Sequence, residues 1–118
     1  FQMLFPGAPA IYYGDELGMT GENDPGCRGG MAWDTPDKAL HAWQKELIAL
    51  RKKHQCLRTG AYRMLAAKDN LFAFQRADQK DCVITVFNTG DKPQQLDLTD
   101  AEEPVHIPPH SVKIIKRP

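Results

Sequence analysis

The sequence predicts an α+β chain in two parts: one strand, a loop and a helix of an α/β barrel over residues 1–56, then an antiparallel β-sandwich over residues 57–118. Three observations predict this organisation: one apolar run without polar alternation, one long amphipathic stretch, and six short apolar runs separated by turn residues. A run of the first kind is typical of a strand covered on both faces, as in an α/β barrel. The chain supplies only one such strand, so it reads as a piece of a larger domain.

The predicted barrel strand covers about residues 9–14. Pro6 and Gly7 end any preceding helix, residues 10–13 are apolar and partly β-branched or aromatic, and Gly14 lets the chain turn away. Because the strand is expected to be buried, its two tyrosines are expected to be core residues, with stacking on a sugar as the alternative.

A loop and then a helix are predicted to follow. Residues 17–34 carry five glycines, which favours a loop, and long loops in compact domains are usually functional or disordered. The helix is expected over about residues 36–55, with Thr35 as its cap and Pro36 as its first residue. Its apolar face combines residues at three- and four-residue spacing: Leu40, Trp43, Leu47, Leu50 and His54. The basic run that begins at Arg51 is expected to be a solvated helix end.

Six short strands are predicted in the second part: residues 62–67, 71–76, 82–88, 94–98, 105–107 and 111–116. Turn residues at 68–70 and 89–92 are predicted to close hairpins. Short strands at near-regular spacing are typical of an antiparallel sandwich.

The run G-x-P-x-I-Y-Y-G-D-E at residues 7–16 and the D-P-G-C-R run at residues 24–28 resemble the end of the barrel in α-amylase-family glycoside hydrolases. Within that family the neopullulanase, maltogenic amylase and cyclomaltodextrinase group is the most similar. The resemblance continues through M-A-W-D at residues 31–34 and through residues 48–60, and becomes weaker in the later strands. It implies that residues 1–56 are the last strand, loop and helix of a (β/α)8 barrel, and that the whole enzyme hydrolyses α-1,4 or α-1,6 glucosidic bonds with retention.

Asp24 and Arg28 are the predicted substrate-binding residues. They stand four apart in the Gly-rich loop, where a guanidinium and a carboxylate can hold vicinal sugar hydroxyls. The resemblance implies that they lie beside the donor-side sugar subsites of the complete enzyme. The alternative is a salt bridge within the loop that only shapes it, and the two interpretations are compatible.

No catalytic residue is predicted in this chain. Asp15 and Glu16 are adjacent, so on a strand they would point to opposite faces and could not act on one bond. We expect one of them to fix the turn and the other to pair with a basic neighbour. The resemblance implies that the catalytic carboxylates lie on earlier barrel strands, so the fragment alone is expected to be inactive.

Composition excludes several partner classes. The 15 Lys and Arg residues balance 15 Asp and Glu residues, which gives no indication of nucleic acid, and no apolar stretch reaches membrane length. Three scattered cysteines (Cys27, Cys56 and Cys82) suit reduced thiols in a cytoplasmic protein, and neither a metal site nor a cofactor is expected.

The expected partners are an α-glucan or maltooligosaccharide and the remainder of the barrel. The isolated chain is also expected to self-associate through its unpaired apolar strand. A non-catalytic sandwich that binds carbohydrate or protein is the alternative function, and it requires an exposed aromatic platform.

Overall fold

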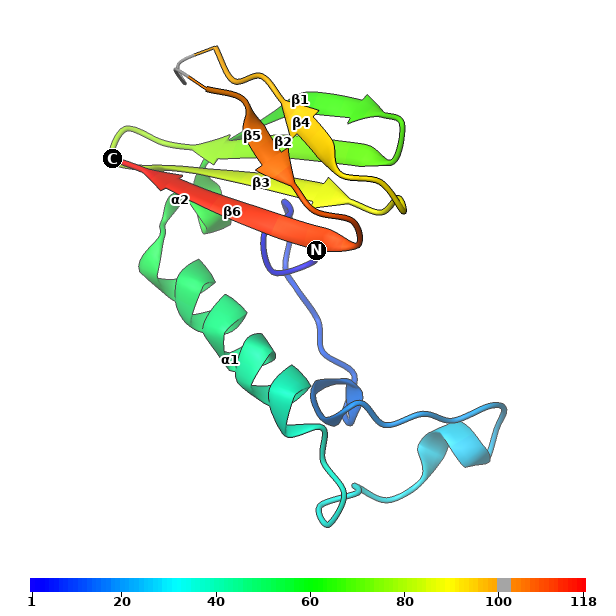
Figure 1. The fold of residues 1–118 in the computed structure, drawn as a ribbon. Helices are drawn as coiled ribbons and strands as arrows, with labels where there is room; N and C mark the ends of the chain where they lie inside the picture. The colour runs from blue at the N-terminus through cyan, green and yellow to red at the C-terminus, as the bar shows by residue number, and fades with distance from the viewer. Residues whose placement is uncertain (100–102) are drawn as a thin grey trace. The chain divides into compact units, whose positions relative to one another are not determined.

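The computed structural model describes residues 1–99 and 103–118. The chain divides into two compact units, Phe1–Lys53 and His54–Pro118, here named unit 1 and unit 2. Figure 1 shows unit 1 in blue to green and unit 2 in green to red. The division falls three residues before the boundary expected from the sequence.

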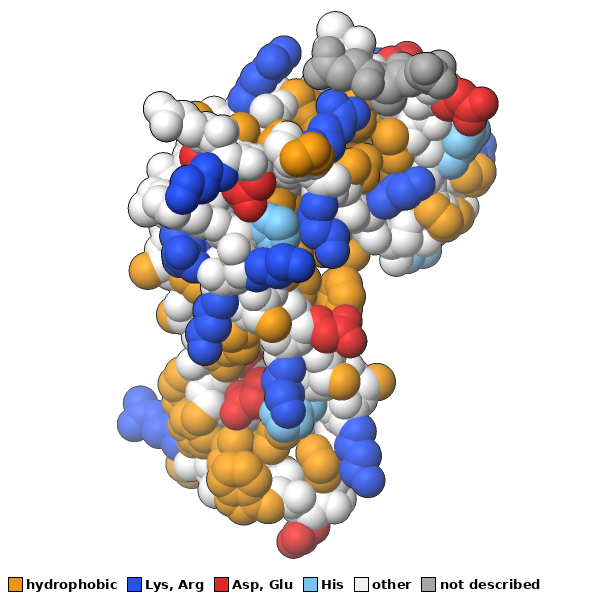
Figure 2. Space-filling view, turned by 90° about the vertical axis from the view of Figure 1, so that its left-hand side faces the viewer, with side chains coloured by type: hydrophobic (Ala, Val, Ile, Leu, Met, Phe, Trp, Pro, Cys, Tyr) orange, Lys and Arg blue, Asp and Glu red, His pale blue; other side chains and the backbone are white. Residues whose placement is uncertain are grey.

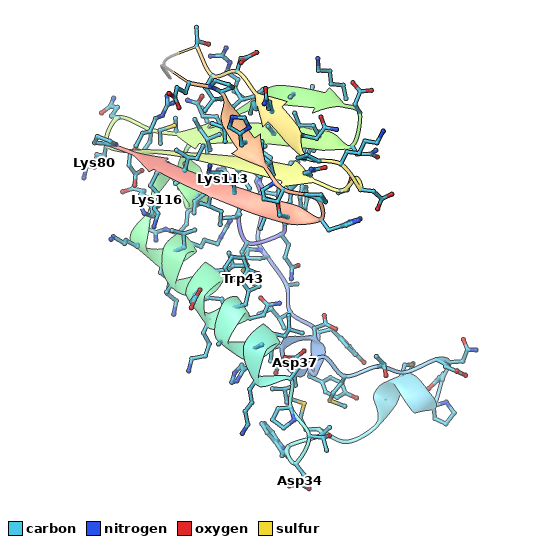
Figure 3. All side chains as sticks on the ribbon, in the orientation of Figure 1. Asp34, Asp37, Trp43, Lys80, Lys113 and Lys116 are labelled. Carbon is cyan, nitrogen blue, oxygen red and sulfur yellow. The ribbon has the colours of Figure 1, made fainter. Side chains whose placement is uncertain are left out.

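The main helix of unit 1, α1, covers Lys38–Lys53. Its cap is Asp37, whose Oδ1 accepts a hydrogen bond from the backbone N–H of Leu40 at 2.9 Å. Figure 3 shows Asp37 at the start of α1. The expected start at Thr35 and Pro36 is therefore wrong, because an aspartate two residues later satisfies the free N–H groups of the first turn.

The buried face of α1 also differs from the expectation. Leu47 is buried as expected, but Trp43 is 42% exposed and Arg51 is only 9% exposed. Arg51 is buried because its guanidinium donates hydrogen bonds to three backbone carbonyls of the N-terminal segment. A basic residue near a helix end is ordinarily solvated, so the sequence did not indicate this contact.

The strand expected at residues 9–14 does not form. Residues 8–12 belong to no helix or strand, and Asp15–Leu17 form a short 3-10 helix, η1. Tyr12 and Tyr13 are 57% and 42% exposed, so their expected core position is also wrong in this structure. Strand structure requires a neighbouring strand to accept and donate backbone hydrogen bonds, and the described part of unit 1 contains none.

Unit 2 contains the six strands. They are β1 (Ala61–Lys68), β2 (Leu71–Ala77), β3 (Cys82–Asn88), β4 (Gln94–Leu96), β5 (Val105–Ile107) and β6 (Ser111–Arg117). A four-stranded antiparallel sheet has the order β1-β2-β3-β6, and β4 and β5 form a separate antiparallel pair. All six predicted strands are thus confirmed, with shifts of a few residues at their ends.

The two predicted turns have different outcomes. Asp69 and Asn70, with φ of 50° and 64°, close the β1-β2 hairpin, because both residue types tolerate the left-handed region. The segment 89–92 does not close a hairpin. It carries the chain from β3 to β4, which belongs to the other sheet.

The core of unit 2 lies between the two sheets, where β4 and β5 cover one face of the larger sheet (Figure 1). Alternate residues of the strands supply it, as the two-residue period of a strand requires. The buried members are Leu71, Ala73, Ile84, Val86, Leu96 and Ile107.

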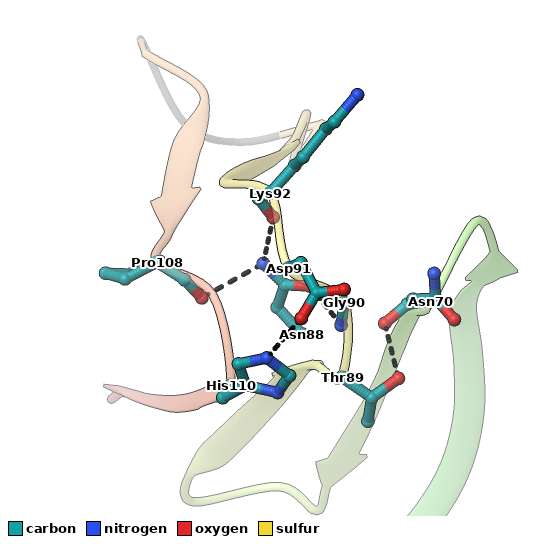
Figure 4. A network of polar contacts seen from close by, with 8 residues as sticks. All are labelled: Asn70, Asn88, Thr89, Gly90, Asp91, Lys92, Pro108 and His110. Carbon is teal, nitrogen blue, oxygen red and sulfur yellow. Dashed lines mark hydrogen bonds and ion pairs between the residues drawn. The ribbon is translucent and has the colours of Figure 1, made fainter.

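A buried amide connects the ends of these strands (Figure 4). Asn88, 1% exposed, donates from Nδ2 to the carbonyls of Lys92, Ile107 and Pro108 at 2.8, 3.2 and 3.0 Å. Its Oδ1 accepts from the N–H of Gly90 at 3.0 Å. One side chain of β3 thereby satisfies backbone groups of β5 and of the two segments that connect the sheets, which fixes how the chain crosses between them.

The short helix α2 (Cys56–Thr59) is attached to the sheet by Arg76 of β2. This buried guanidinium donates to the carbonyls of Leu57 and Gly60 at 3.1 and 2.9 Å. A Cβ at Gly60 would lie 2.5 Å from the carbonyl oxygen of Cys56, so only glycine fits at this junction.

Candidate functional site

The Gly-rich loop of unit 1 follows η1 and is held at its base by two contacts. Tyr13 Oη donates to the carbonyl of Gly29 at 2.9 Å, and the N–H of Ala32 lies 3.4 Å from Met19 Sδ. The two arms of the loop also touch, because a Cβ at Gly21 would lie 2.7 Å from the Cα of Cys27. The loop therefore has a defined path even though most of its residues are exposed.

The two predicted site residues meet at the end of this loop. Arg28 Nε lies 3.3 Å from Asp24 Oδ1, and the side chains of Arg28 and Asp24 are 70% and 60% exposed. The intervening residues form a 3-10 turn, η2 (Gly26–Arg28), in which the N–H of Arg28 donates to the Pro25 carbonyl at 2.9 Å. This turn places the side chains of Asp24 and Arg28, which are four residues apart, on the same side of the loop.

The ion pair leaves hydrogen-bonding groups free on both residues. Within the described residues, Asp24 Oδ2 and the terminal Nη groups of Arg28 have no protein partner. An exposed ion pair contributes about 0–1 kcal/mol, too little to shape a loop by itself. Chemically, the pair presents charged donors and acceptors side by side, the arrangement that suits a polyhydroxylated ligand.

The adjacent carboxylates, Asp15 and Glu16, are not an acid–base pair. Glu16 Oε2 accepts a hydrogen bond from the N–H of Gly14 at 2.9 Å, which confirms that one carboxylate fixes this turn. The other expectation is wrong, because Asp15 is exposed and forms no ion pair within the described residues. Gly14 itself requires glycine, since its φ is 94° and a Cβ would lie 2.7 Å from Met19 Sδ.

A hollow of about 290 Å³ lies at the base of the loop. It is lined by Leu17, Gly18, Met19, Thr20, Ala32 and Thr35. Neither residue of the Asp24–Arg28 ion pair reaches it, so the hollow and the ion pair are separate features of the loop.

Unit 2 holds a polar cluster that the sequence did not indicate. His54 Nδ1 lies 2.5 Å from Asp81 Oδ2, and the thiol of Cys56 interacts with the same carboxylate. Burial, followed by the contact with this carboxylate, raises the pKa of Cys56 to about 12. The contact with Cys56, and then that with His54, lowers the pKa of Asp81. A thiol held protonated is a poor nucleophile, so the cluster is structural.

Other kinds of site are not found among the described residues. No group of three or more His, Cys, Asp or Glu side chains there could hold a metal ion, and no helix there is long and apolar enough to cross a bilayer. Lys and Arg side chains are spread over the face seen in Figure 2 and do not form one patch.

The aromatic side chains in the described part of unit 2 are mostly half-buried or buried. Its large aromatic residues are Tyr62, Phe72, Phe74 and Phe87. Only Tyr62 is exposed, at 40%, and Phe74 is fully buried. A single exposed ring offers little area for the aromatic platform that the alternative, a non-catalytic binding module, requires.

The chain is similar to several curated α-glucan hydrolases. A cyclomaltodextrinase from Geobacillus thermopakistaniensis is 42% identical over 83% of this chain, and neopullulanase 2 from Thermoactinomyces vulgaris is 41% identical over 81% of it. The chain spans 17% of the length of each of these relatives. No protein-family model matches it.

Solved structures agree with these relatives. A cyclic α-maltosyl-(1→6)-maltose hydrolase from Arthrobacter globiformis matches 98% of this chain and 27% of its own, with a TM-score of 0.87 and 26% identity. A maltogenic amylase from S. marinus matches 98% of this chain and 18% of its own, with a TM-score of 0.85 and 30% identity. The chain thus belongs to the α-amylase family of glycoside hydrolases, as the C-terminal part of an enzyme of the cyclomaltodextrinase, neopullulanase and maltogenic amylase group.

Proposed function

We propose that this chain completes the barrel of a retaining α-glucan hydrolase and supplies a substrate-binding loop, while the catalytic carboxylates lie outside it. The exposed Asp24–Arg28 ion pair carries the proposal, because its free donor and acceptor groups suit sugar hydroxyls. Relatives named cyclomaltodextrinase and neopullulanase support an α-glucan or maltooligosaccharide as the ligand.

Unit 1 is then the last strand, loop and helix of the barrel, and unit 2 is the β-sandwich domain that follows it. Two observations support the assignment: unit 1 holds one α-helix and no strand pair, and unit 2 holds an antiparallel core. The barrel supplies the partner strands that residues 9–14 lack. Chain segments of this kind bury their apolar side chains only when the rest of the barrel is present.

The test uses a hybrid enzyme in which this chain replaces the matching segment of the Geobacillus cyclomaltodextrinase. Asp24→Ala and Arg28→Ala are each expected to raise KM for maltotriose about tenfold or more, because each removes a hydrogen bond made by a charged group. Glu22→Ala, an exposed carboxylate of the same loop, is the matched control and is expected to leave KM unchanged.

The two roles of the ion pair give different results in this test. If the pair only shapes the loop, Asp24→Ala lowers the melting temperature of the hybrid and leaves KM and kcat unchanged. That result would contradict the substrate-binding role.

Three further expectations belong to this proposal. The isolated chain has no hydrolytic activity. It self-associates at high concentration through the exposed side chains of Ile11, Tyr12 and Tyr13, and light scattering detects this association. The location is cytoplasmic, as supported by a Bacillus subtilis relative, 35% identical over 85% of this chain, that is named intracellular maltogenic amylase.

A further inference from the structure

The side chain of Tyr13 connects the segment before η1 to the returning arm of the Gly-rich loop. Its hydroxyl donates a hydrogen bond to the carbonyl of Gly29, sixteen positions later in the sequence, at 2.9 Å. Gly29 directly follows Arg28, the cationic member of the exposed ion pair. A phenol hydroxyl therefore holds the backbone next to the guanidinium that is proposed to bind substrate.

Separate contacts close the base of the loop. The N–H of Asp37 donates to the carbonyl of Leu17 at 2.9 Å, and the N–H of Ala32 lies 3.4 Å from Met19 Sδ. Figure 1 shows the loop, in blue to cyan, leaving η1 and returning to the start of α1. These contacts fix the base, whereas Tyr13 reaches a point farther along the returning arm.

The end of the loop makes contacts with itself. A Cβ at Gly21 would lie 2.7 Å from the Cα of Cys27, so the two arms touch just before Arg28. The N–H of Arg28 donates to the Pro25 carbonyl at 2.9 Å, and its Nε lies 3.3 Å from Asp24 Oδ1. All of these partners belong to the loop, so they shape its end without attaching that end to η1 or α1.

Among the described residues, the Tyr13 hydroxyl is the hydrogen-bond donor that attaches this end of the loop to the segment before η1. The attachment matters because positions 29 and 30 are both glycine, the residue with the greatest conformational freedom. An arm that is ordered before substrate arrives loses less conformational entropy on binding. The Tyr13 hydrogen bond thus orders the part of the loop that carries Arg28.

We propose that Tyr13 is a positioning residue, whose hydroxyl fixes the place of Arg28 by holding the carbonyl of Gly29. The inference rests on the proposed function, in which Arg28 contacts the sugar, and goes beyond it by assigning a role to a residue outside the loop. The hydroxyl proton of Tyr13 is used by the loop, so Tyr13 acts on substrate binding through Arg28. Its loss weakens binding and leaves the chemical step unchanged.

The test compares four forms of the hybrid enzyme that carries this chain: the parent, Tyr13→Phe, Arg28→Ala and the double variant. Tyr13→Phe keeps the ring and is expected to raise KM for maltotriose about threefold without changing kcat, because one neutral hydrogen bond is lost. In the double variant, KM should equal that of Arg28→Ala, since Tyr13 acts through Arg28. Tyr62→Phe, which removes the hydroxyl of a 40% exposed tyrosine in unit 2, is the control and should leave KM unchanged.

A second measurement follows the loop without substrate. Trypsin cleaves after arginine, and the bond between Arg28 and Gly29 lies in an exposed part of the loop, so mass spectrometry can follow its cleavage. We expect cleavage of this bond to be about threefold faster in Tyr13→Phe than in the parent or in Tyr62→Phe, because the open form of the arm is more populated.

The outcomes separate this inference from the proposed function. Equal cleavage rates of the parent and Tyr13→Phe would overturn the inference. So would an unchanged KM for Tyr13→Phe beside a raised KM for Arg28→Ala, or additive effects of the two substitutions. Faster cleavage in Tyr13→Phe together with an unchanged KM for Arg28→Ala would support the hold of Tyr13 on the loop and contradict only the proposed function.

Discussion

The buried side chain of Asn88 provides the sharpest test of how unit 2 is held together. In Asn88→Ala, the carbonyls of Lys92, Ile107 and Pro108 lose their shared donor, and the N–H of Gly90 loses its acceptor. Asn88 is 1% exposed, so water does not readily replace these bonds. The substitution removes a side chain that satisfies four backbone groups.

The expected loss of unfolding free energy is about 3 kcal/mol. A net hydrogen bond is worth about 1 kcal/mol, and the amide contributes two N–H donors and one acceptor, with a further cost for the carbonyls left buried. With a urea m-value of about 2 kcal/mol/M, the unfolding midpoint should fall by about 1.5 M. Far-UV circular dichroism follows this transition because unit 2 holds all the strands of the described residues.

Two companion variants test whether the hydrogen bonds of the Asn88 amide are the cause of this loss. Asn88→Asp keeps an acceptor but has no donor for the three carbonyls, so it should cost at least as much as alanine despite its similar shape. Asp91→Ala removes the contact between Asp91 and His110. Because the Asp91 side chain is 94% exposed, this substitution should lower the free energy of unfolding by about 0.5 kcal/mol or less. Equal midpoints for Asn88→Ala and Asp91→Ala would refute the proposed role of the buried amide.

Three further predictions concern the junction of α2 with the sheet. Because the pKa of Cys56 is raised, its contribution to the free energy of unfolding is complete below about pH 9 and is lost as the pH rises toward 12. The stability of Cys56→Ala should therefore lack this loss at alkaline pH, which unfolding measured over a pH series detects. The lowered pKa of Asp81 has the opposite sign, so its contribution is present above about pH 3.8 and is lost as the pH falls below that value, and Asp81→Asn should abolish this part of the acid transition. Gly60→Ala should prevent folding of unit 2 or lower its melting temperature by more than about 10 °C. A Cβ there would lie 2.5 Å from the carbonyl oxygen of Cys56 and 2.7 Å from that of Ala77, and neither backbone can yield. A melting curve like that of the parent would contradict this prediction.

The sequence predicted the secondary structure best where an element is determined by residues close to it in the chain. The strands β3 and β5 have the predicted limits, because alternating apolar residues and flanking turn residues are both local signals. The helix start was misplaced by two residues, since Thr35-Pro36 and Asp37 are both good initiation signals and only the hydrogen bond to Leu40 distinguishes them.

The errors arose where a residue's environment depends on distant parts of the chain. The strand at residues 9–14 lacks its partners here, and no property of the segment itself could show that. Arg51 was expected at a solvated helix end and Asn88 at the end of a strand, and both are buried because backbone carbonyls remote in sequence surround them.

Of the candidate site, the sequence supplied both residues but not their geometry. The four-residue spacing of Asp24 and Arg28 allows an ion pair only if the intervening residues form a turn, which η2 provides. The cluster of His54, Cys56 and Asp81 had no sequence signal, because its carboxylate comes from the turn between β2 and β3.

The proposed function makes this chain the C-terminal part of an α-glucan hydrolase whose catalytic carboxylates lie outside it. Its test measures hydrolysis of maltotriose and β-cyclodextrin by the purified 118-residue chain, beside the hybrid in which this chain replaces the matching segment of the Geobacillus cyclomaltodextrinase. We predict hydrolysis by the hybrid and none by the chain alone. Hydrolysis by the 118 residues alone would contradict the account and would make Asp15, Glu16 and Asp24 the candidates for catalysis.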